Sequence, residues 1–254
     1  MIVNKIYFRL VVGVDFEDIK LLKYKLQYIK TLPIEDVFVL LHFKKGHNLV
    51  DFTTLIKDSN ITNIKLWQAH RFIEENKIEQ MNNLIGKLSE DVWILNNDCD
   101  EFPDFGENPG ELIDNVCSSD ADYLRGGIID RLPIDNNIDK KLDSDVDLMS
   151  QFPVNANMHG LKDVPDTCAF IKGCHECLMP KVVMNKNKFS ITNGHHHLNE
   201  RTAKEYPVTI PVYHFKWFDG VRSRLCEIHH DVPTSKKNFL IKHVNNNSFE
   251  KAIF

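Results

Sequence analysis

Long hydrophobic runs are absent from this sequence of 254 residues. No stretch approaches the roughly 20 consecutive apolar residues that a membrane-spanning helix requires, so we expect no membrane span. Lys5 and Arg9 interrupt the apolar residues of the amino-terminal segment, which therefore predicts a strand rather than a secretory signal. These observations favour a cytoplasmic protein.

A surplus of positive charge is also missing. Lys and Arg together number 31 and Asp and Glu together number 36, which gives a formal net charge of −5. Such a chain has no overall basic field to attract nucleic acid or an anionic membrane, and we expect neither as a partner. The 6 cysteines are too sparse for a disulfide framework, so reduced thiols are expected.

Glycine-rich phosphate loops are missing as well. The chain holds 11 glycines, and the first predicted strand ends in Val12-Gly13-Val14 rather than in a glycine-rich loop. This argues against a P-loop nucleotide-binding protein. Hydrophobic residues still make up 43% of the chain, which suffices for the core of one α/β domain or of two small ones.

Strand-like and helix-like segments alternate along the first half of the chain. Apolar runs predict strands at residues 5–14, 36–44, 61–67, 91–97 and 123–131. Apolar residues at helical spacing predict helices at 16–31, 49–57 and 71–88, with Asp15 as the N-cap of the first. This alternation implies right-handed crossovers and an α/β fold with a mostly parallel sheet flanked by helices. Shorter strands are expected at 168–172, 181–185, 189–192 and 209–217, and a helix around 221–229.

Residues 91–102, which read DVWILNNDCDEF, carry the strongest functional signal. The apolar run predicts a buried strand, and Asp98, Asp100 and Glu101 follow at its carboxyl end, where open α/β sheets bind their ligands. Three neighbouring carboxylates repel one another unless they are exposed or neutralised by a cation. Because Mg²⁺ and Mn²⁺ prefer oxygen ligands and often share them with substrate phosphates, the segment predicts a metal that grips a diphosphate. An exposed acidic turn is the alternative.

The same residues resemble a known family. WILNNDCDEF is similar to the D-x-D-E-F segment of family-2-like glycosyltransferases with a GT-A fold, and looser similarities lie in YLRGGIIDR at 123–131, in PKVV at 180–183 with NGHHH at 193–197, and in VYHFKW at 212–217. The resemblance spans residues 5–225. It implies one GT-A-like domain over residues 1–254, with a nucleotide-sugar-binding half at 1–102 and an acceptor-binding half with a C-terminal segment at 103–254.

In such proteins a sugar moves from a nucleotide-sugar donor, here with a UDP-sugar favoured, to a hydroxyl of a glycan or glycoconjugate acceptor. The resemblance implies that Asp98 and Asp100 bind a Mn²⁺ or Mg²⁺ ion and the diphosphate, and that His214 is a further metal ligand. A packed or solvated His214 is the alternative. Lys216 would neutralise the leaving diphosphate, because preformed positive charge stabilises developing negative charge.

The remaining candidate residues are placed by their position along the chain. Val12 and Asp15, at the end of the first strand, are expected near the nucleotide, and Lys77 of the helix at 71–88 is expected near the phosphates. Asp130 and Arg131, at another strand end, are expected to hold the acceptor, with a structural ion pair as the alternative. A transfer with inversion needs a general base, for which Asp166 and Glu176 are candidates.

Two further stretches stand out. Residues 132–166 are polar and rich in Pro and Asn, and they predict a long segment without regular structure, which is often functional in a compact domain. His195, His196 and His197 follow one another, and strand alternation would put His195 and His197 on one face. Together with Cys174 and Cys177 they also permit a structural zinc site, the less favoured interpretation.

Three functions remain open on the sequence alone. A metal-dependent glycosyltransferase is preferred. Another metal-dependent phosphate-handling enzyme, either a nucleotidyltransferase or a phosphohydrolase, would use the same carboxylates, although a glycine-rich loop would be expected near the first strand. A catalytically inert relative that binds a glycan is the third, and the intact acidic segment at 98–101 argues against it.

Overall fold

The computed structural model describes residues 5–13, 18–70, 74–134, 140–156, 180–192, 195–216 and 218–219. The chain divides into two compact units. Unit 1 comprises Met1–Gly126 and Pro180–Val212, and unit 2 comprises Gly127–Met179 and Tyr213–Phe254. The expected single domain with halves that meet at residue 102 stays a prediction. None of the described helices is long and apolar enough to cross a membrane.

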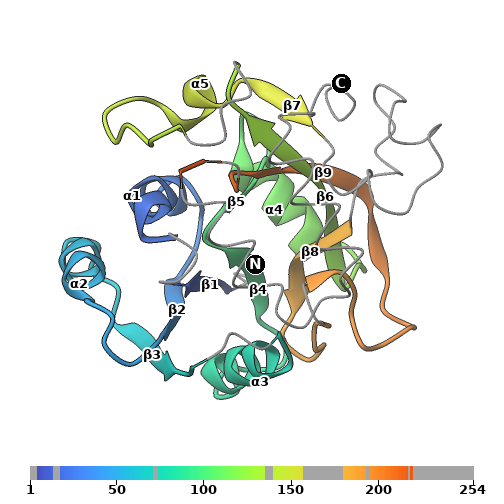
Figure 1. Cartoon of the computed structure of the whole chain (residues 1–254). Coiled ribbons are helices and arrows are strands. Elements are labelled where there is room, and N and C mark those ends of the chain that lie inside the picture. Colours follow the sequence, from blue (N-terminus) through green and yellow to red (C-terminus); the bar gives the residue numbers. More distant parts are fainter. Residues whose placement is uncertain are drawn as a thin grey trace, which may run out of the picture. The chain divides into compact units, whose positions relative to one another are not determined.

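Unit 1 is built on four parallel strands. They are β1 (Ile6–Gly13), β2 (Asp36–Phe43), β3 (Asn63–Gln68) and β4 (Trp93–Asp98), connected by the helices α1 (Asp18–Ile29), α2 (Val50–Lys57) and α3 (Glu74–Ile85) (Figure 1). β1 pairs with β2 and with β4, and β2 pairs with β3, all in parallel. Nearly every residue of β1 is buried, as expected for a strand covered on both faces. The α/β fold with a largely parallel sheet is therefore confirmed.

The order in which strands are added to the sheet reverses beside β1. The order is β3, β2, β1 and β4, followed by β8 (Pro180–Lys186), β6 (Tyr123–Leu132), β9 (Glu205–His214) and β5 (Glu101–Pro103). The chain therefore moves outward from β1 to β3 and then returns to the other side of β1. In open α/β sheets, ligands bind outside the carboxyl ends of the strands at such a topological switch point. β8 (Pro180–Lys186) pairs antiparallel with β4, which makes the sheet mixed. β6 (Tyr123–Leu132) and β9 (Glu205–His214) continue from unit 1 into unit 2.

The sequence did not predict two elements of unit 1, β5 (Glu101–Pro103) and α4 (Pro109–Ser118). The expected strand at 189–192 is reduced to an isolated bridge between Ile191 and Leu198. The core on the α3 side of the sheet is formed by apolar side chains from several strands and from α3: Val11, Leu40, Trp67, Met81, Val182 and Ile191.

Unit 2 contains local structure where the sequence predicted none. α5 (Leu148–Gln151) begins after Asp147, whose carboxylate accepts from the amide of Ser150, and β7 (Val154–Ala156) pairs antiparallel with β6. The buried side chain of Gln151 holds this segment in place through hydrogen bonds, although the segment has no regular apolar pattern. Its amide donates to the carbonyls of Asp143 and Val146 at 2.9 and 2.8 Å and accepts from the amide of Asp143 at 2.9 Å. The elements expected at 168–172 and 221–229 lie outside the described residues.

Candidate functional site

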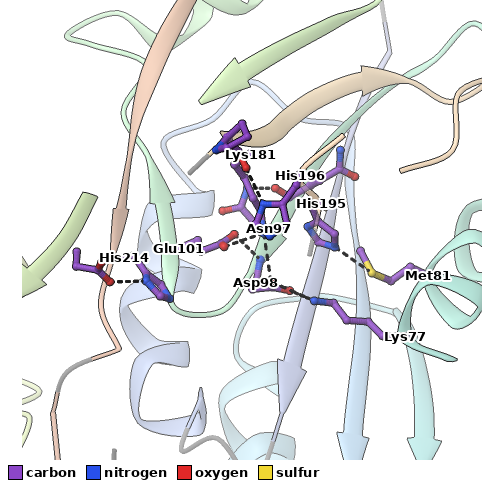
Figure 2. Close-up of polar contacts among 12 residues, drawn as sticks. Lys77, Met81, Asn97, Asp98, Glu101, Lys181, His195, His196 and His214 are labelled. Carbon is purple, nitrogen blue, oxygen red and sulfur yellow. Dashed lines mark hydrogen bonds and ion pairs between the residues drawn. The ribbon is translucent and has the colours of Figure 1, made fainter. Parts of the chain in front are cut away.

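A network of ion pairs lies at the carboxyl end of β4 in unit 1. Nζ of Lys77 is 3.0 Å from Oδ1 of Asp98, and Nζ of Lys181 is 3.3 Å from Oδ2 of the same carboxylate. Lys181 also contacts Oε1 of Glu101 at 2.7 Å, and Glu101 accepts from the amide of Asp98 at 3.3 Å. Figure 2 shows these side chains close together with His195 and His196 beside them. We call Lys77, Asp98, Glu101 and Lys181 the charge network.

The charge network joins four elements. Lys77 comes from α3, Lys181 from the start of β8, and the two carboxylates from the end of β4 and the start of β5. In β1, Val11 is the register partner of Asp98, so the network lies at the switch point between β1 and β4. Both lysines are almost fully buried, whereas 23% of the Asp98 side chain is exposed. The carboxylate of Asp98 is therefore the part of the network that a ligand reaches most easily.

The lysines keep Asp98 ionised. Burial alone would raise the pKa of Asp98, but the charges of Lys181 and Lys77 outweigh burial and hold this pKa well below its ordinary value. Burial likewise opposes the charged form of Lys181, and Asp98 and Glu101 raise the pKa of Lys181 above its ordinary value. The mutual repulsion expected within the acidic segment is thus relieved in part by ammonium groups of the chain itself.

Two further basic side chains are buried along β4, on opposite faces of the sheet. Lys25 of α1 donates to Oδ1 of Asn97 at 3.0 Å and to the carbonyl of Glu101, and its ammonium lies 4.2 Å from the ring centre of Phe102. Burial lowers the pKa of Lys25 to about 8. On the α3 face, Arg9 donates to Asn96, and burial lowers its pKa to about 9. Both side chains therefore stay mainly protonated at neutral pH.

His195 lies on the α3 face, within electrostatic reach of the charge network. Its Nε2 is 3.3 Å from Sδ of Met81, and burial together with the charge of Lys181 lowers the pKa of His195 well below its ordinary value. The backbone of His195 has a φ of 59°, and residues 195–197 are not a strand. The predicted alternation of the three histidines is therefore wrong: His195 is buried, while His196 and His197 line a separate cavity.

The other donor-side candidates are spread along the same strands. Val12 is fully buried in β1, and its contact with the nucleotide stays a prediction. Asp100 is half-buried in the two-residue turn between β4 and β5, so the alternation of side chains along β4 does not extend to it. Cys99, in that turn, faces α1, with Sγ 3.4 Å from the carbonyl of Asp18. Asp15, Asp166, Glu176, Cys174 and Cys177 lie outside the described residues.

The acceptor-side candidates lie in unit 2 and are engaged by its own residues. Nδ1 of His214 is 2.8 Å from Oδ1 of the fully buried Asp130. Nε of Arg131 donates to the carbonyl of Phe152 at 2.8 Å, and its Nη1 donates to Asn155. Lys216 is half-buried just after β9. Contacts of Asp130 and Arg131 with an acceptor, and of His214 with a metal, stay predictions.

The acidic segment fits a hard divalent cation in its chemistry. Asp98 and Asp100 offer carboxylate oxygens, and both are partly exposed. Within the described ranges, no three His, Cys, Asp or Glu side chains gather in a way that would hold a metal ion. Mg²⁺ is commonly bound through one or two carboxylates together with substrate phosphates and water, and two carboxylates suffice for that arrangement.

Comparisons with known proteins yield similar structures only. No family model and no curated protein matches the sequence. TarS from S. aureus (residues 1–349) in complex with UDP is 11% identical over 96% of this chain and 72% of that chain, with a TM-score of 0.41. Its complex with UDP-GlcNAc is 10% identical over 96% and 72%, with a TM-score of 0.40.

Nucleotidyltransferase structures are also similar. A 4-diphosphocytidyl-2C-methyl-D-erythritol synthase is 14% identical over 56% of this chain and 65% of that chain, with a TM-score of 0.32. The UTP-bound UGPase from Acinetobacter baumannii is 14% identical over 55% and 62%, with a TM-score of 0.28. At these identities and TM-scores the likenesses concern folds and establish no function for the chain.

Proposed function

We propose that this chain is a glycosyltransferase that moves a sugar from a nucleoside-diphosphate sugar, with UDP as the favoured nucleotide, to a hydroxyl of a glycan or glycoconjugate. The observation that carries the proposal is the charge network at the switch point between β1 and β4. Buried ion pairs add little net stability because desolvation offsets their attraction. Such a network, at the place where open α/β sheets bind ligands, indicates a site prepared for a charged ligand.

The proposed reaction exchanges one bond at the anomeric carbon of the sugar. The bond from this carbon to the β-phosphate oxygen breaks, and the acceptor oxygen forms a new bond to the same carbon. The nucleoside diphosphate leaves with the electron pair, and the acceptor proton passes to a base, for which Asp166 and Glu176 are proposed. Because negative charge develops on the leaving diphosphate, preformed positive charge accelerates this step, and we assign that role to Lys77, Lys181 and Lys216.

A Mn²⁺ or Mg²⁺ ion belongs to the same proposal, with Asp98 and Asp100 as its ligands. When bound, the ion would neutralise part of the charge on the diphosphate. Lys77 and Lys181 prepare the site by keeping Asp98 ionised and fixing the orientation of its carboxylate.

Phosphorus NMR of the purified protein with UDP-glucose or UDP-N-acetylglucosamine, Mg²⁺ and a mixture of glycan acceptors tests the function. We expect free UDP to appear together with a glycosylated acceptor. The Asp100→Asn variant should release little UDP, while the matched Cys99→Ser variant should behave like the parent protein. Formation of a sugar 1-phosphate would instead indicate nucleotidyl transfer, and an unchanged donor in every mixture would contradict the proposal.

A further inference from the structure

Unit 1 contains a separate cavity, and two of its lining residues directly follow a neighbour of the charge network in the sequence. His195 is buried near Asp98, and the next two residues, His196 and His197, line a cavity of about 360 Å³. Its other polar lining residues are Tyr123, Arg125, Glu200 and Arg201. This volume falls within the range of small-molecule sites, roughly 300 to 1,000 Å³. No member of the charge network lines the cavity, so it is a second site rather than an extension of the first.

One wall of the cavity is held rigid by Glu205. Oη of Tyr123 donates to Oε2 of Glu205 at 2.7 Å, and Nε of Arg125 lies 2.9 Å from Oε1 of the same carboxylate. A guanidinium has five N–H groups, of which this pairing uses the Nε group. The Arg125 side chain is 44% exposed, so a ligand can approach it. This wall offers hydrogen-bond donors in a fixed orientation.

Another part of the lining offers acceptors. Oε2 of Glu200 is buried and has no hydrogen-bond partner in the part of the chain that the structure describes. A buried oxygen without a partner is costly, and a hydroxyl group of a ligand would satisfy it. Nδ1 of His196 lies 2.7 Å from the carbonyl of Pro180, and because a carbonyl only accepts, Nδ1 carries the proton. In the neutral ring Nε2 is then an acceptor.

The mixture of donors and acceptors selects the class of ligand. A simple anion would be attracted by Arg125 and Arg201 but repelled by the carboxylate of Glu200. An apolar molecule would leave all of these polar groups without hydrogen bonds. Sugar hydroxyls both donate and accept, and neighbouring hydroxyls suit the paired atoms of guanidinium and carboxylate groups. We propose that this cavity binds a neutral monosaccharide unit of a glycan. This binding does not require the transfer activity proposed above.

NMR titration of the full chain tests the proposal through the imidazole signals of His196 and His197. The probes are the methyl glycosides of glucose and N-acetylglucosamine, with inorganic phosphate as the competing class. We expect a saturable shift with at least one glycoside. Glu200→Gln keeps the shape but removes the charged acceptor, and Arg201→Gln removes donors from an exposed position. Each should weaken binding about tenfold, as expected for one hydrogen bond to a charged group.

Lys204→Gln is the matched control, because Lys204 is exposed and pairs with Asp120 rather than lining the cavity. It should bind the glycoside like the parent protein. Circular dichroism of each variant confirms that it is folded, and the two lining variants report independently. Saturation by phosphate with no response to either glycoside would overturn the proposal. Unchanged affinity in both Glu200→Gln and Arg201→Gln would do so as well.

Discussion

At the scale of single residues, Asp98 and Asp100 lie two positions apart but have different surroundings. Asp98 ends β4 and pairs with two almost fully buried lysines, whereas Asp100 is half-buried in a turn. Removing one partner of a buried ion pair costs about 3 to 5 kcal/mol, and partial exposure of Asp98 reduces that penalty. The two carboxylates should therefore differ in their effects on stability and on transfer.

We predict that Asp98→Asn lowers the free energy of unfolding by about 2 to 4 kcal/mol, because Lys77 and Lys181 lose an anionic partner. Asp100→Asn should leave this free energy unchanged or slightly higher, yet remove most of the sugar transfer. Urea unfolding and the phosphorus NMR assay measure the two effects. Cys99→Ser is the control, because a serine hydroxyl can keep the contact with the carbonyl of Asp18. Equal destabilisation by both Asp variants, or full transfer by Asp100→Asn, would contradict the assignment.

The pair of His214 and Asp130 supports a second prediction at this scale. A carboxylate that accepts from one ring nitrogen fixes the tautomer and the orientation of the imidazole, as it does for many metal-binding histidines. Replacing such a carboxylate typically costs 10- to 100-fold in activity, so we predict a loss of about this size for Asp130→Asn. In this variant the NMR signal of the proton on Nδ1 of His214 should also change, because its acceptor has changed.

Asn155→Ala is the control for this prediction, because it removes a contact of Arg131 in the same unit without touching His214. It should leave the His214 signal in place. If His214→Ala lowers the melting temperature steeply while the activity per folded molecule stays normal, His214 serves packing rather than catalysis.

At the scale of elements, Gly126 of β6 is required by close packing. A Cβ atom at this position would lie 2.4 Å from Cγ2 of Val212 and 2.7 Å from Cγ2 of Val183, so both valines would have to move. We predict that Gly126→Ala lowers the free energy of unfolding by about 1 to 3 kcal/mol, as overpacking does elsewhere. Gly110→Ala in α4 is the matched control, since its added Cβ meets nothing closer than 3.7 Å.

Denaturant unfolding compares the two alanine variants. The Gly110 variant should be at least as stable as the parent protein, because alanine suits a helix better than glycine does. If Gly126→Ala is equally harmless, the packing around β6 is looser than the structure indicates.

Several of the elements that the sequence predicted have a strong apolar period. β1, β2, β4 and α1 have long runs or stripes of apolar residues, and they lie close to their predicted positions. α4 was not predicted, although Pro109 and Gly110 stand at its first two positions. The first turn of a helix tolerates Pro, and here the side chain of the N-cap residue Asn108 accepts from the amide of Glu111 at 3.4 Å. This N-terminal signal was readable from the sequence.

The candidate site could likewise be predicted only where its residues form a local pattern in the sequence. The acidic segment was predictable because its residues follow one another after an apolar run. Lys77 was expected near the phosphates, but its ion pair with Asp98 and that of Lys181 were not expected, because no local pattern links positions so far apart. Lys181 directly precedes the buried apolar residues Val182, Val183 and Met184 of β8, and this position was the signal that its charge is buried and paired.

At the scale of the whole molecule, ligand binding and folding are coupled. A ligand that binds only the native state stabilises it by mass action, by about 2.7 kcal/mol at a concentration of 100 times Kd. For a protein of this size, each kcal/mol shifts Tm by about 2 to 4 °C. We therefore predict that UDP with Mn²⁺ or Mg²⁺ at such concentrations raises Tm by about 5 to 10 °C.

The metal should be needed for this shift. Lys77 and Lys181 already neutralise Asp98 in the unliganded protein, and a diphosphate adds negative charge that a cation at Asp98 and Asp100 would balance. A chelator should therefore abolish most of the shift produced by UDP. Asp100→Asn should lose the same metal-dependent part, while Gly110→Ala retains it. An equal shift with and without the chelator would show that the buried lysines alone compensate the diphosphate, and the metal assignment would then be wrong. No shift with any nucleoside diphosphate would contradict nucleotide binding itself.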